Sequence, residues 1–143
     1  PTHSAYAKAA ANGFRSVLTL RTARDGVDAM RERFLVEQNK LSYFNIPATV
    51  KLPGYGQVDE FLKLVREPAN HPMLINCAFA ERVAPFMMIF RIVEQHWSED
   101  KAVEEASLSG LKRDQLKKFA QDYLASQKKT RSKPASTTRA AVP

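Results

Sequence analysis

A chain of 143 residues and 16.1 kDa corresponds to one domain and is too short for two ordinary ones. Hydrophobic residues make up 44% of it and charged residues 26%, so the chain can bury a core and is not globally disordered. No apolar run approaches eighteen residues, which excludes a membrane-spanning helix, and a single cysteine excludes an intramolecular disulfide or a multi-cysteine metal site. The three histidines lack metal-binding spacing, so we expect neither a metal nor a cofactor.

The net charge of +7 is concentrated at the C-terminal end of the sequence. Residues 128–143 hold five basic and no acidic residues, which leaves 17 basic against 15 acidic residues in the rest of the chain. This end is rich in Ser, Thr, Ala and Pro and lacks apolar periodicity, so we predict a folded domain over 1–126 and a disordered basic tail over 127–143. Such a tail can contact nucleic acid or an anionic surface, but we favour a solvated end.

Helices and strands are expected to alternate in the first half of the chain. In chain order we predict a helix over 4–13, a strand over 14–22, a helix over 27–39, a strand over 41–47, a loop over 48–56, a helix over 57–67, a strand over 72–76, and helices over 83–97, 98–110 and 112–126.

The expected helix over 27–39 illustrates how these assignments are made. Val27, Met30, Phe34 and Leu35 recur at helical spacing with charges between them, which predicts that these four side chains face inward. The helix is separated from the strand before it by Asp25-Gly26, which we interpret as a break.

Strands that are separated by helical crossovers predict an α/β domain with a mostly parallel central sheet flanked by helices. In such sheets, ligands bind beyond the carboxyl ends of the strands. The segment that follows the third expected strand, NCAFAERVAP over 76–85, is therefore the candidate site.

This segment contains the only cysteine, Cys77, and an arginine five residues later, Arg82. A tight loop between a strand and a helix N-terminus directs backbone N–H groups inward, and the helix dipole adds positive potential. A cysteine in that field is expected to have a lowered pKa and to be a nucleophilic thiolate, while the planar arginine fork binds two oxygens of an anion. Pro85 fits the first helical turn, where its missing N–H costs nothing.

The sequence HPMLINCAFAERVAPFMMIFRIVEQHWSEDKAVEEA resembles the Cys-x4-Arg branch of the bacterial protein-tyrosine-phosphatase-like superfamily, which is related to dual-specificity phosphatases. The similarity extends upstream, through GFRSVLTLRT and NIPATVKLPGYGQVDEFLKLV, and covers residues 4–125. It implies a cysteine-phosphatase-like fold and a phosphorylated substrate whose class the sequence does not reveal.

The resemblance also implies a mechanism. Cys77 would attack phosphorus to form a phosphocysteine, while Arg82 and the loop residues Ala78, Phe79 and Ala80 bind the phosphoryl oxygens. The general acid of the family is usually an Asp on the loop after the second strand, but this chain has no acidic residue between positions 44 and 58.

Three further positions depart from the family's pattern. Asn76 replaces the His that commonly precedes the nucleophile, and Ala80 replaces a mid-loop Gly that normally allows a positive φ. Glu81 places a carboxylate beside the anion site, where repulsion is expected to weaken binding. Glu81 itself, or Asp59 on the next helix, is a candidate substitute for the general acid, and a weak enzyme or a pseudo-enzyme also fits these departures.

Two alternatives stay open beside the phosphatase hypothesis. The short Cys-to-Arg span also resembles rhodanese-type sulfurtransferases, in which the cysteine carries a persulfide and no general acid is needed. The other alternative is a non-catalytic module that binds an anion or a partner.

Two residues outside the loop complete the candidate site. Arg21 ends the first strand and either faces the anion or forms an ion pair, and Tyr55 either stacks on an aromatic leaving group or simply packs. No signal-peptide pattern opens the sequence, so we favour the cytoplasm as its compartment.

Overall fold

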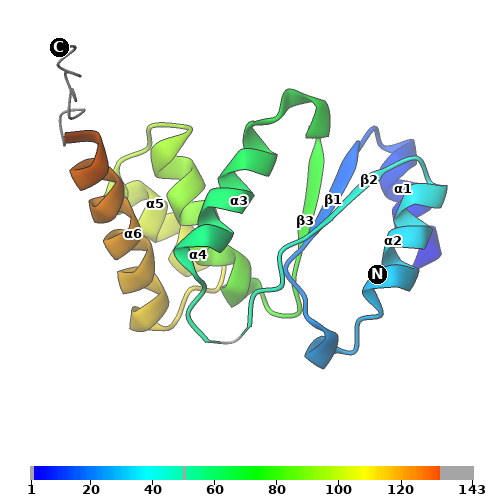
Figure 1. The fold of residues 1–143 in the computed structure, drawn as a ribbon, viewed down its shortest axis with the longest axis horizontal. Coiled ribbons are helices and arrows are strands. Elements are labelled where there is room, and N and C mark those ends of the chain that lie inside the picture. Colours follow the sequence, from blue (N-terminus) through cyan, green and yellow to red (C-terminus); the bar gives the residue numbers. More distant parts are fainter. Residues whose placement is uncertain (1, 50, 133–143) are drawn as a thin grey trace, which may run out of the picture.

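A three-stranded sheet with helices on both faces forms the fold (Figure 1). The computed structural model describes residues 2–49 and 51–132. The strands are β1 (Ser16–Thr19), β2 (Ser42–Asn45) and β3 (Met73–Asn76). The α-helices of the described residues are α1 (His3–Ala11), α2 (Ala29–Gln38), α3 (Tyr55–Arg66), α4 (Ala80–Val93), α5 (Glu99–Leu108) and α6 (Asp114–Ser132), with 3-10 turns η1 (Ala23–Asp25) and η2 (Pro68–Asn70).

The strand order is β2-β1-β3, and both neighbours run parallel to the central strand β1. Thr19 at the end of β1 pairs in register with Asn45 of β2 and Asn76 of β3. All three strands therefore end at the same edge of the sheet, and the segments that follow them converge there. The expected α/β class with a parallel central sheet is confirmed.

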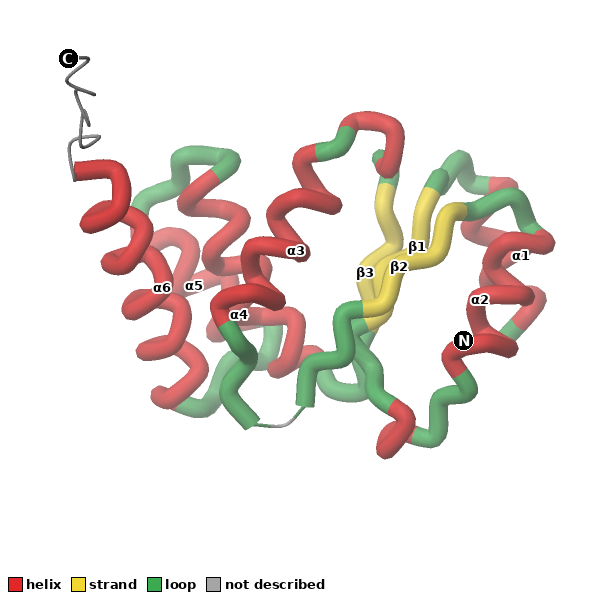
Figure 2. The backbone as a smooth tube through the Cα atoms, viewed as in Figure 1, coloured by secondary structure: helices red, strands yellow, loops and turns green. Residues whose placement is uncertain are grey.

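The sheet separates two hydrophobic clusters of unequal size. The larger cluster lies between the sheet and helices α3 to α6, and the smaller one lies between the sheet and helices α1 and α2 (Figures 1 and 2). Alternation along β1 explains the division, because Leu18 faces the larger cluster whereas its neighbour Val17 faces the smaller one. Both residues are fully buried, as expected of a strand covered on both faces.

The inward face of α2 is only partly the one that its apolar spacing predicts, since Leu35 packs against the smaller cluster but Met30 and Phe34 do not. Met30 is 85% exposed and Phe34 is 59% exposed, while Val36 and the carboxylate residue Glu32 are buried. The side chain of Glu32 accepts hydrogen bonds from the buried Tyr6 hydroxyl at 2.5 Å and from the Tyr43 hydroxyl at 3.1 Å. These hydroxyls satisfy the carboxylate in the smaller cluster, so the helix turns Glu32 inward and leaves Met30 and Phe34 outside.

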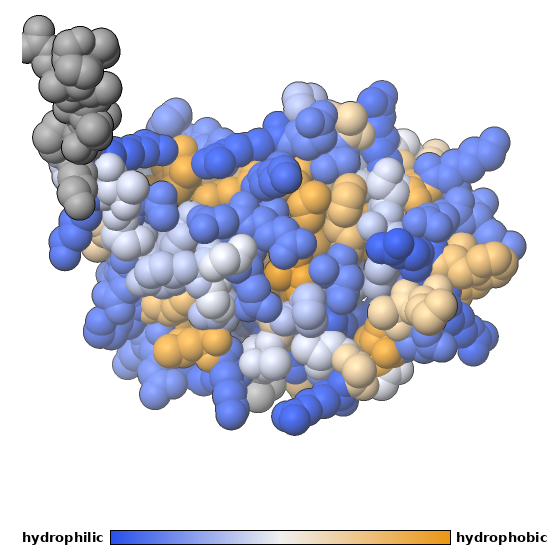
Figure 3. Space-filling view, viewed as in Figure 1, coloured by the Kyte–Doolittle hydropathy of each residue, from blue (hydrophilic) through white to orange (hydrophobic). Residues whose placement is uncertain are grey.

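Helix α6 extends to Ser132 and is therefore longer than expected, since residues 127–132 of the predicted tail are helical. Residues 133–143, the rest of that predicted tail, lie outside the described residues. The face in Figure 3 is mostly hydrophilic, with apolar residues in separate patches. Among the described helices, none combines the length and the hydropathy that crossing a membrane requires.

Candidate active site

The candidate site is built where β3 passes into α4. Cys77 directly follows the last residue of β3, and the extended backbone of Phe79 (φ −134°, ψ 130°) ends the loop before Ala80 opens the helix. The amide of Arg82 donates to the carbonyl of Phe79 at 2.9 Å, which closes the first turn. The predicted nucleophile and the predicted anion-binding arginine are thus both held at a strand-to-helix turn, at the carboxyl edge of the sheet.

Two expectations about this turn are corrected by the start of α4. Ala80 is already helical and has no positive φ, so the loop does not need the glycine that the family pattern suggested. Pro85 lies inside the helix, at its sixth residue, rather than in the first turn. The glycine that the backbone favours lies opposite, at Gly110, where φ is +115°; a Cβ there would be in ordinary contact with the Cβ of Ala80, at 3.4 Å.

The thiol of Cys77 is half-buried and donates to the carbonyl oxygen of Phe79 at 2.6 Å. Burial raises the pKa of the Cys77 thiol and outweighs the backbone hydrogen bonds of Val83, Phe79 and Arg82 and the positive charge of Arg82, which lower it. The predicted lowering of this pKa is therefore wrong for this conformation.

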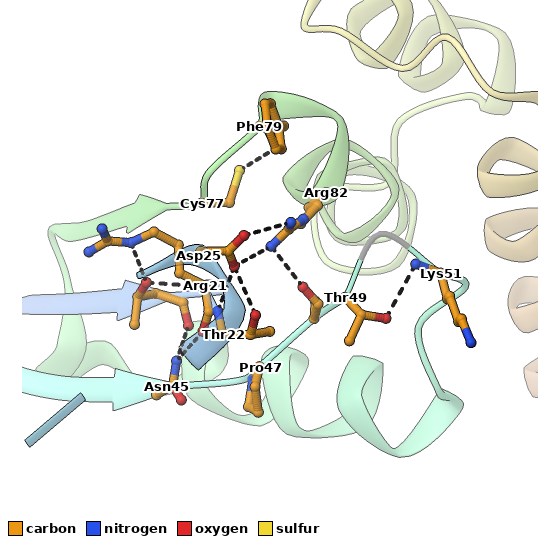
Figure 4. A network of polar contacts seen from close by, with 12 residues as sticks. Arg21, Thr22, Asp25, Asn45, Pro47, Thr49, Lys51, Cys77, Phe79 and Arg82 are labelled. Carbon is orange, nitrogen blue, oxygen red and sulfur yellow. Dashed lines mark hydrogen bonds and ion pairs between the residues drawn. The ribbon is translucent and has the colours of Figure 1, made fainter. Parts of the chain in front are cut away.

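The positive charge of Arg82 does not offset the effect of burial on this pKa, because Arg82 is paired with a carboxylate. Arg82 is 94% buried and pairs with both carboxylate oxygens of Asp25, at 2.6 Å from Nη1 to Oδ2 and 2.9 Å from Nη2 to Oδ1 (Figure 4). Nη1 also donates to the carbonyl of Ala48 at 3.2 Å. The guanidinium holds the pKa of the Asp25 carboxyl well below its ordinary value, so the two charges neutralise each other.

Asp25 is the site residue that sequence reasoning missed, since it was interpreted only as a break after the first strand. It lies 57 residues before Arg82 in the chain, on the turn η1 that follows β1. One partial signal was present in the sequence: Asp25 follows the first expected strand closely, and the segments after parallel strands meet at one edge of the sheet. That β1 is the central strand, next to β3, is known only from the structure.

Glu81, the predicted substitute acid, is turned away from the thiol. Its carboxylate accepts from Nε of Arg113 at 3.0 Å and from the Arg113 backbone amide at 3.2 Å, at the start of α6. Asp59 on α3, the other candidate, accepts a hydrogen bond from the hydroxyl of Tyr123 at 2.6 Å. Neither carboxylate is directed at Cys77 in this structure.

The two candidate residues outside the loop are both engaged elsewhere. Arg21 forms an ion pair with Glu32 of α2 and donates from Nε to the hydroxyl of Thr19 at 3.3 Å. Tyr55 packs against α6, with ring centroids 5.5 Å from Phe119 and 5.3 Å from Tyr123. Among the alternatives that the sequence left open, the ion pair and the packing role are the ones present here.

A cavity of about 420 Å³ opens beside the loop, between the end of β3, the start of α4 and helix α5. Cys77 and Ala80 line it on one side, and Ala106 and Ser109 line it on the other. The loop residues Ala78, Phe79 and Ala80 are exposed, so the thiol is approachable from solvent at the loop. Within the described residues, no group of three or more His, Cys, Asp or Glu side chains is arranged to hold a metal ion.

Several solved structures of phosphatase-like proteins share the fold of this chain. TpbA of P. aeruginosa is 20% identical, with a TM-score of 0.64 over 88% of this chain and 75% of that one. The core catalytic domain of the PP-IP phosphatase SIW14 of S. cerevisiae is 18% identical, with a TM-score of 0.69 over 90% and 84%. Tk-PTP in its active form is 14% identical, with a TM-score of 0.70 over 86% of each chain. The chain has the fold of the protein-tyrosine-phosphatase-like proteins.

The predicted cysteine-phosphatase-like fold is thereby confirmed. No family model and no curated protein sequence matches the chain. In the phosphatase-like fold, β3, the loop from Cys77 to Phe79 and helix α4 form the strand-loop-helix unit on which the function proposed below rests.

Proposed function

We propose that the protein is a cysteine-dependent phosphate-ester hydrolase in which Cys77 is the nucleophile and Arg82 binds the phosphoryl oxygens. The observation that carries this proposal is the position of Cys77 at the turn between β3 and α4, in a fold shared with phosphatases. One structure of TpbA contains phosphotyrosine, which supports an aryl phosphate as the first substrate class to test.

The proposed reaction has two steps. In the first, the Cys77 thiolate attacks phosphorus, an S–P bond forms, and the P–O bond to the leaving group breaks. The leaving oxygen takes a proton from water or, for an aryl oxide, departs as the anion. In the second step a water oxygen attacks phosphorus, the S–P bond breaks with its electron pair returning to sulfur as the thiolate, and inorganic phosphate leaves while the proton of the attacking water passes to solvent. Loop amides and Arg82 stabilise the developing charge in both steps.

The general acid is the role in this proposed mechanism that has the least structural support. Glu81 acts as acid or base only if its ion pair with Arg113 opens, because its carboxylate is now turned toward α6. We therefore expect the enzyme to favour leaving groups that need little protonation.

The first test is turnover of a generic aryl phosphate. We expect the wild type to be active, Cys77→Ser to be inactive, and Arg82→Lys to lose about 100-fold in kcat because lysine lacks the planar fork. Arg91→Lys is the matched control, since Arg91 lies on the same helix, forms its ion pair with Glu105 at 2.8 Å, and is not part of the site. Activity that survives Cys77→Ser would refute the thiolate mechanism.

A second candidate is an anion-binding protein without turnover. It is favoured by the raised pKa of Cys77 and by the engagement of Arg82 with Asp25, both of which lower reactivity at neutral pH. The outcome that identifies it is phosphate binding without hydrolysis in the wild type. Sulfur transfer from thiosulfate to cyanide, in the absence of aryl phosphatase activity, would identify the rhodanese-like alternative instead.

A further inference from the structure

We propose that Phe79 is a specificity-determining residue: its ring contacts the aromatic ring of an aryl phosphate ester, so that the site prefers aryl phosphates to alkyl phosphates. This inference rests on the proposed function for the binding of the phosphoryl group, and it adds a residue and a substrate class to that site.

The side chain of Phe79 is exposed in the loop that carries the proposed nucleophile. It is 63% exposed, although Phe is a residue type that proteins usually bury. It belongs to neither of the two hydrophobic clusters that the described residues form, so packing of the core does not explain why a phenyl ring stands there. Its neighbours Ala78 and Ala80 are also exposed, but they present only methyl groups to solvent.

Phe79 lies next to both groups on which the proposed function rests. Its carbonyl oxygen is 2.6 Å from Sγ of Cys77, as the dashed line in Figure 4 marks. The centroid of its ring is 5.7 Å from the guanidinium carbon of Arg82, which is within the range of a cation–π contact. A phosphoryl group bound between the sulfur and the guanidinium is therefore a neighbour of this residue.

The geometry of phosphoryl transfer brings the leaving group to the exposed side of the loop. The attacking and leaving atoms lie roughly in line through phosphorus, so the leaving group points away from the sulfur and toward solvent. An aryl ring is joined to phosphorus through a single oxygen and so remains close to the loop. There it meets the Phe79 ring at about 4.5–7 Å between centroids, the range in which aromatic pairs attract each other. A methyl ester has no ring to place there.

Tyr55, the aromatic residue that the sequence indicated for stacking, is engaged elsewhere. Its ring packs against Phe119 and Tyr123 of α6. Phe79 is instead part of the loop itself, two residues after Cys77. The stacking role therefore falls to Phe79.

The experiment measures binding in a Cys77→Ser background, which cannot form the phosphocysteine. Phenyl phosphate and methyl phosphate are titrated separately, and binding is followed by amide chemical shifts in NMR spectra. The two ligands carry the same phosphoryl group and differ only in the ester group. We expect phenyl phosphate to bind about fivefold more tightly, in keeping with the strength of an aromatic pair. In the same background, Phe79→Ala is expected to remove most of this preference and Phe79→Tyr to keep it.

The use of two ligands separates the ring contact from other effects of the substitution. Phe79→Ala also removes the cation–π contact with Arg82, but this changes the affinity for both ligands alike and leaves their ratio unaffected. Phe34→Ala is the matched control, because Phe34 is similarly exposed, at 59%, and lies on α2, which covers the face of the sheet with the smaller cluster. We expect it to change neither affinity by more than about twofold.

Two results would overturn the proposal. One is a folded Phe79→Ala variant that keeps the original preference for phenyl phosphate, and the other is a Cys77→Ser protein that binds both esters equally or binds neither. Failure of the proposed hydrolase is a separate outcome. A wild type that turns over no aryl phosphate, together with a preference that Phe79→Ala removes, would refute the hydrolase and retain the role of Phe79.

Discussion

Among single residues, Cys77 is the one on whose protonation the proposed mechanism depends. The thiol is half-buried, and burial raises its pKa and so stabilises the neutral form. Arg82 is close enough to lower the pKa of Cys77, but its charge is neutralised by Asp25. Under the proposed mechanism, Cys77 therefore rests as a thiol and has to lose its proton before it attacks phosphorus.

The raised pKa of Cys77 predicts how the rate of its alkylation depends on pH. Only the thiolate reacts with iodoacetamide, so a raised pKa shifts the rate profile to higher pH. We expect the rate in the folded protein to keep rising beyond about pH 10, where an ordinary cysteine of pKa about 8.5 is almost wholly thiolate and its rate has levelled off. Mass spectrometry of the labelled chain measures it, because Cys77 is the single cysteine.

The same cysteine in urea-unfolded protein is the control, and it is expected to level off near the ordinary value. A folded-state profile that levels off below the unfolded one would contradict the burial argument. It would show that the loop amides and Arg82 outweigh burial in solution.

The sequence contained enough information to find Cys77 and Arg82 but not their environment. A cysteine that ends an apolar strand before an apolar helix is visible from local pattern alone, and the structure places both residues at that turn. The pairing of Arg82 with Asp25 depends on the order of the strands, which a single sequence does not contain. Glu81 was misjudged for a similar reason, because its partner Arg113 is 32 residues away.

Among the elements, α2 is the one whose packing departs most from its sequence pattern. Periodicity counts apolar residues, so it predicted Met30 and Phe34 inside. It does not register that hydroxyls from α1 and β2 can satisfy a buried carboxylate at Glu32. Burial and the hydrogen bonds to Glu32 raise the pKa values of Tyr6 and Tyr43, so both hydroxyls stay donors even above the pH at which an ordinary tyrosine ionises.

Glu32→Ala tests this network. The substitution leaves Arg21 and two buried hydroxyls without their shared acceptor, so we expect the free energy of unfolding to fall by about 3 kcal/mol. Urea denaturation measures the change. Glu37→Ala, an exposed position on the same helix, is the matched control and is expected to stay within about 0.5 kcal/mol of the wild type. A loss below about 1 kcal/mol for Glu32→Ala would contradict the network's role.

The boundaries of elements were harder to predict than their order. All nine expected helices and strands are present, and they follow one another along the chain in the predicted order. Helix α4 begins at Ala80 rather than at position 83, because the expectation followed the apolar run and ignored the helix-favouring residues Ala80, Glu81 and Arg82 before it. Helix α6 continues past position 126 without apolar residues, as a polar helical end that periodicity does not detect.

For the whole molecule, the question is how much of α6 the domain needs. The inner stripe of α6 consists of Leu116, Phe119, Ala120 and Tyr123, all of which are buried in the larger cluster. Residues 127–132 extend the helix beyond this stripe. The boundary predicted at position 126 falls inside helix α6, but it still predicts that the residues after it contribute little to the stability of the domain.

Truncation after Ser126 tests that boundary. Because the buried stripe is retained, we expect the free energy of unfolding to change by less than about 1 kcal/mol. Truncation after Lys118 removes Phe119, Ala120 and Tyr123 and is expected to cost more than about 3 kcal/mol. Thermal unfolding of both variants beside the full chain provides the comparison. Similar losses in both would place the domain boundary beyond Ser126.

Cys77 is half-buried and is the one cysteine of the sequence, and both facts affect how its thiol responds to oxidation. An oxidant that reaches Cys77 converts it to a sulfenic acid, and these 143 residues contain no second thiol to condense with it. Repair then depends on a small thiol from outside, which has to reach the sulfur at the exposed loop residues Ala78 and Phe79. The same burial that keeps the sulfur protonated slows its oxidation, because peroxides react with the thiolate.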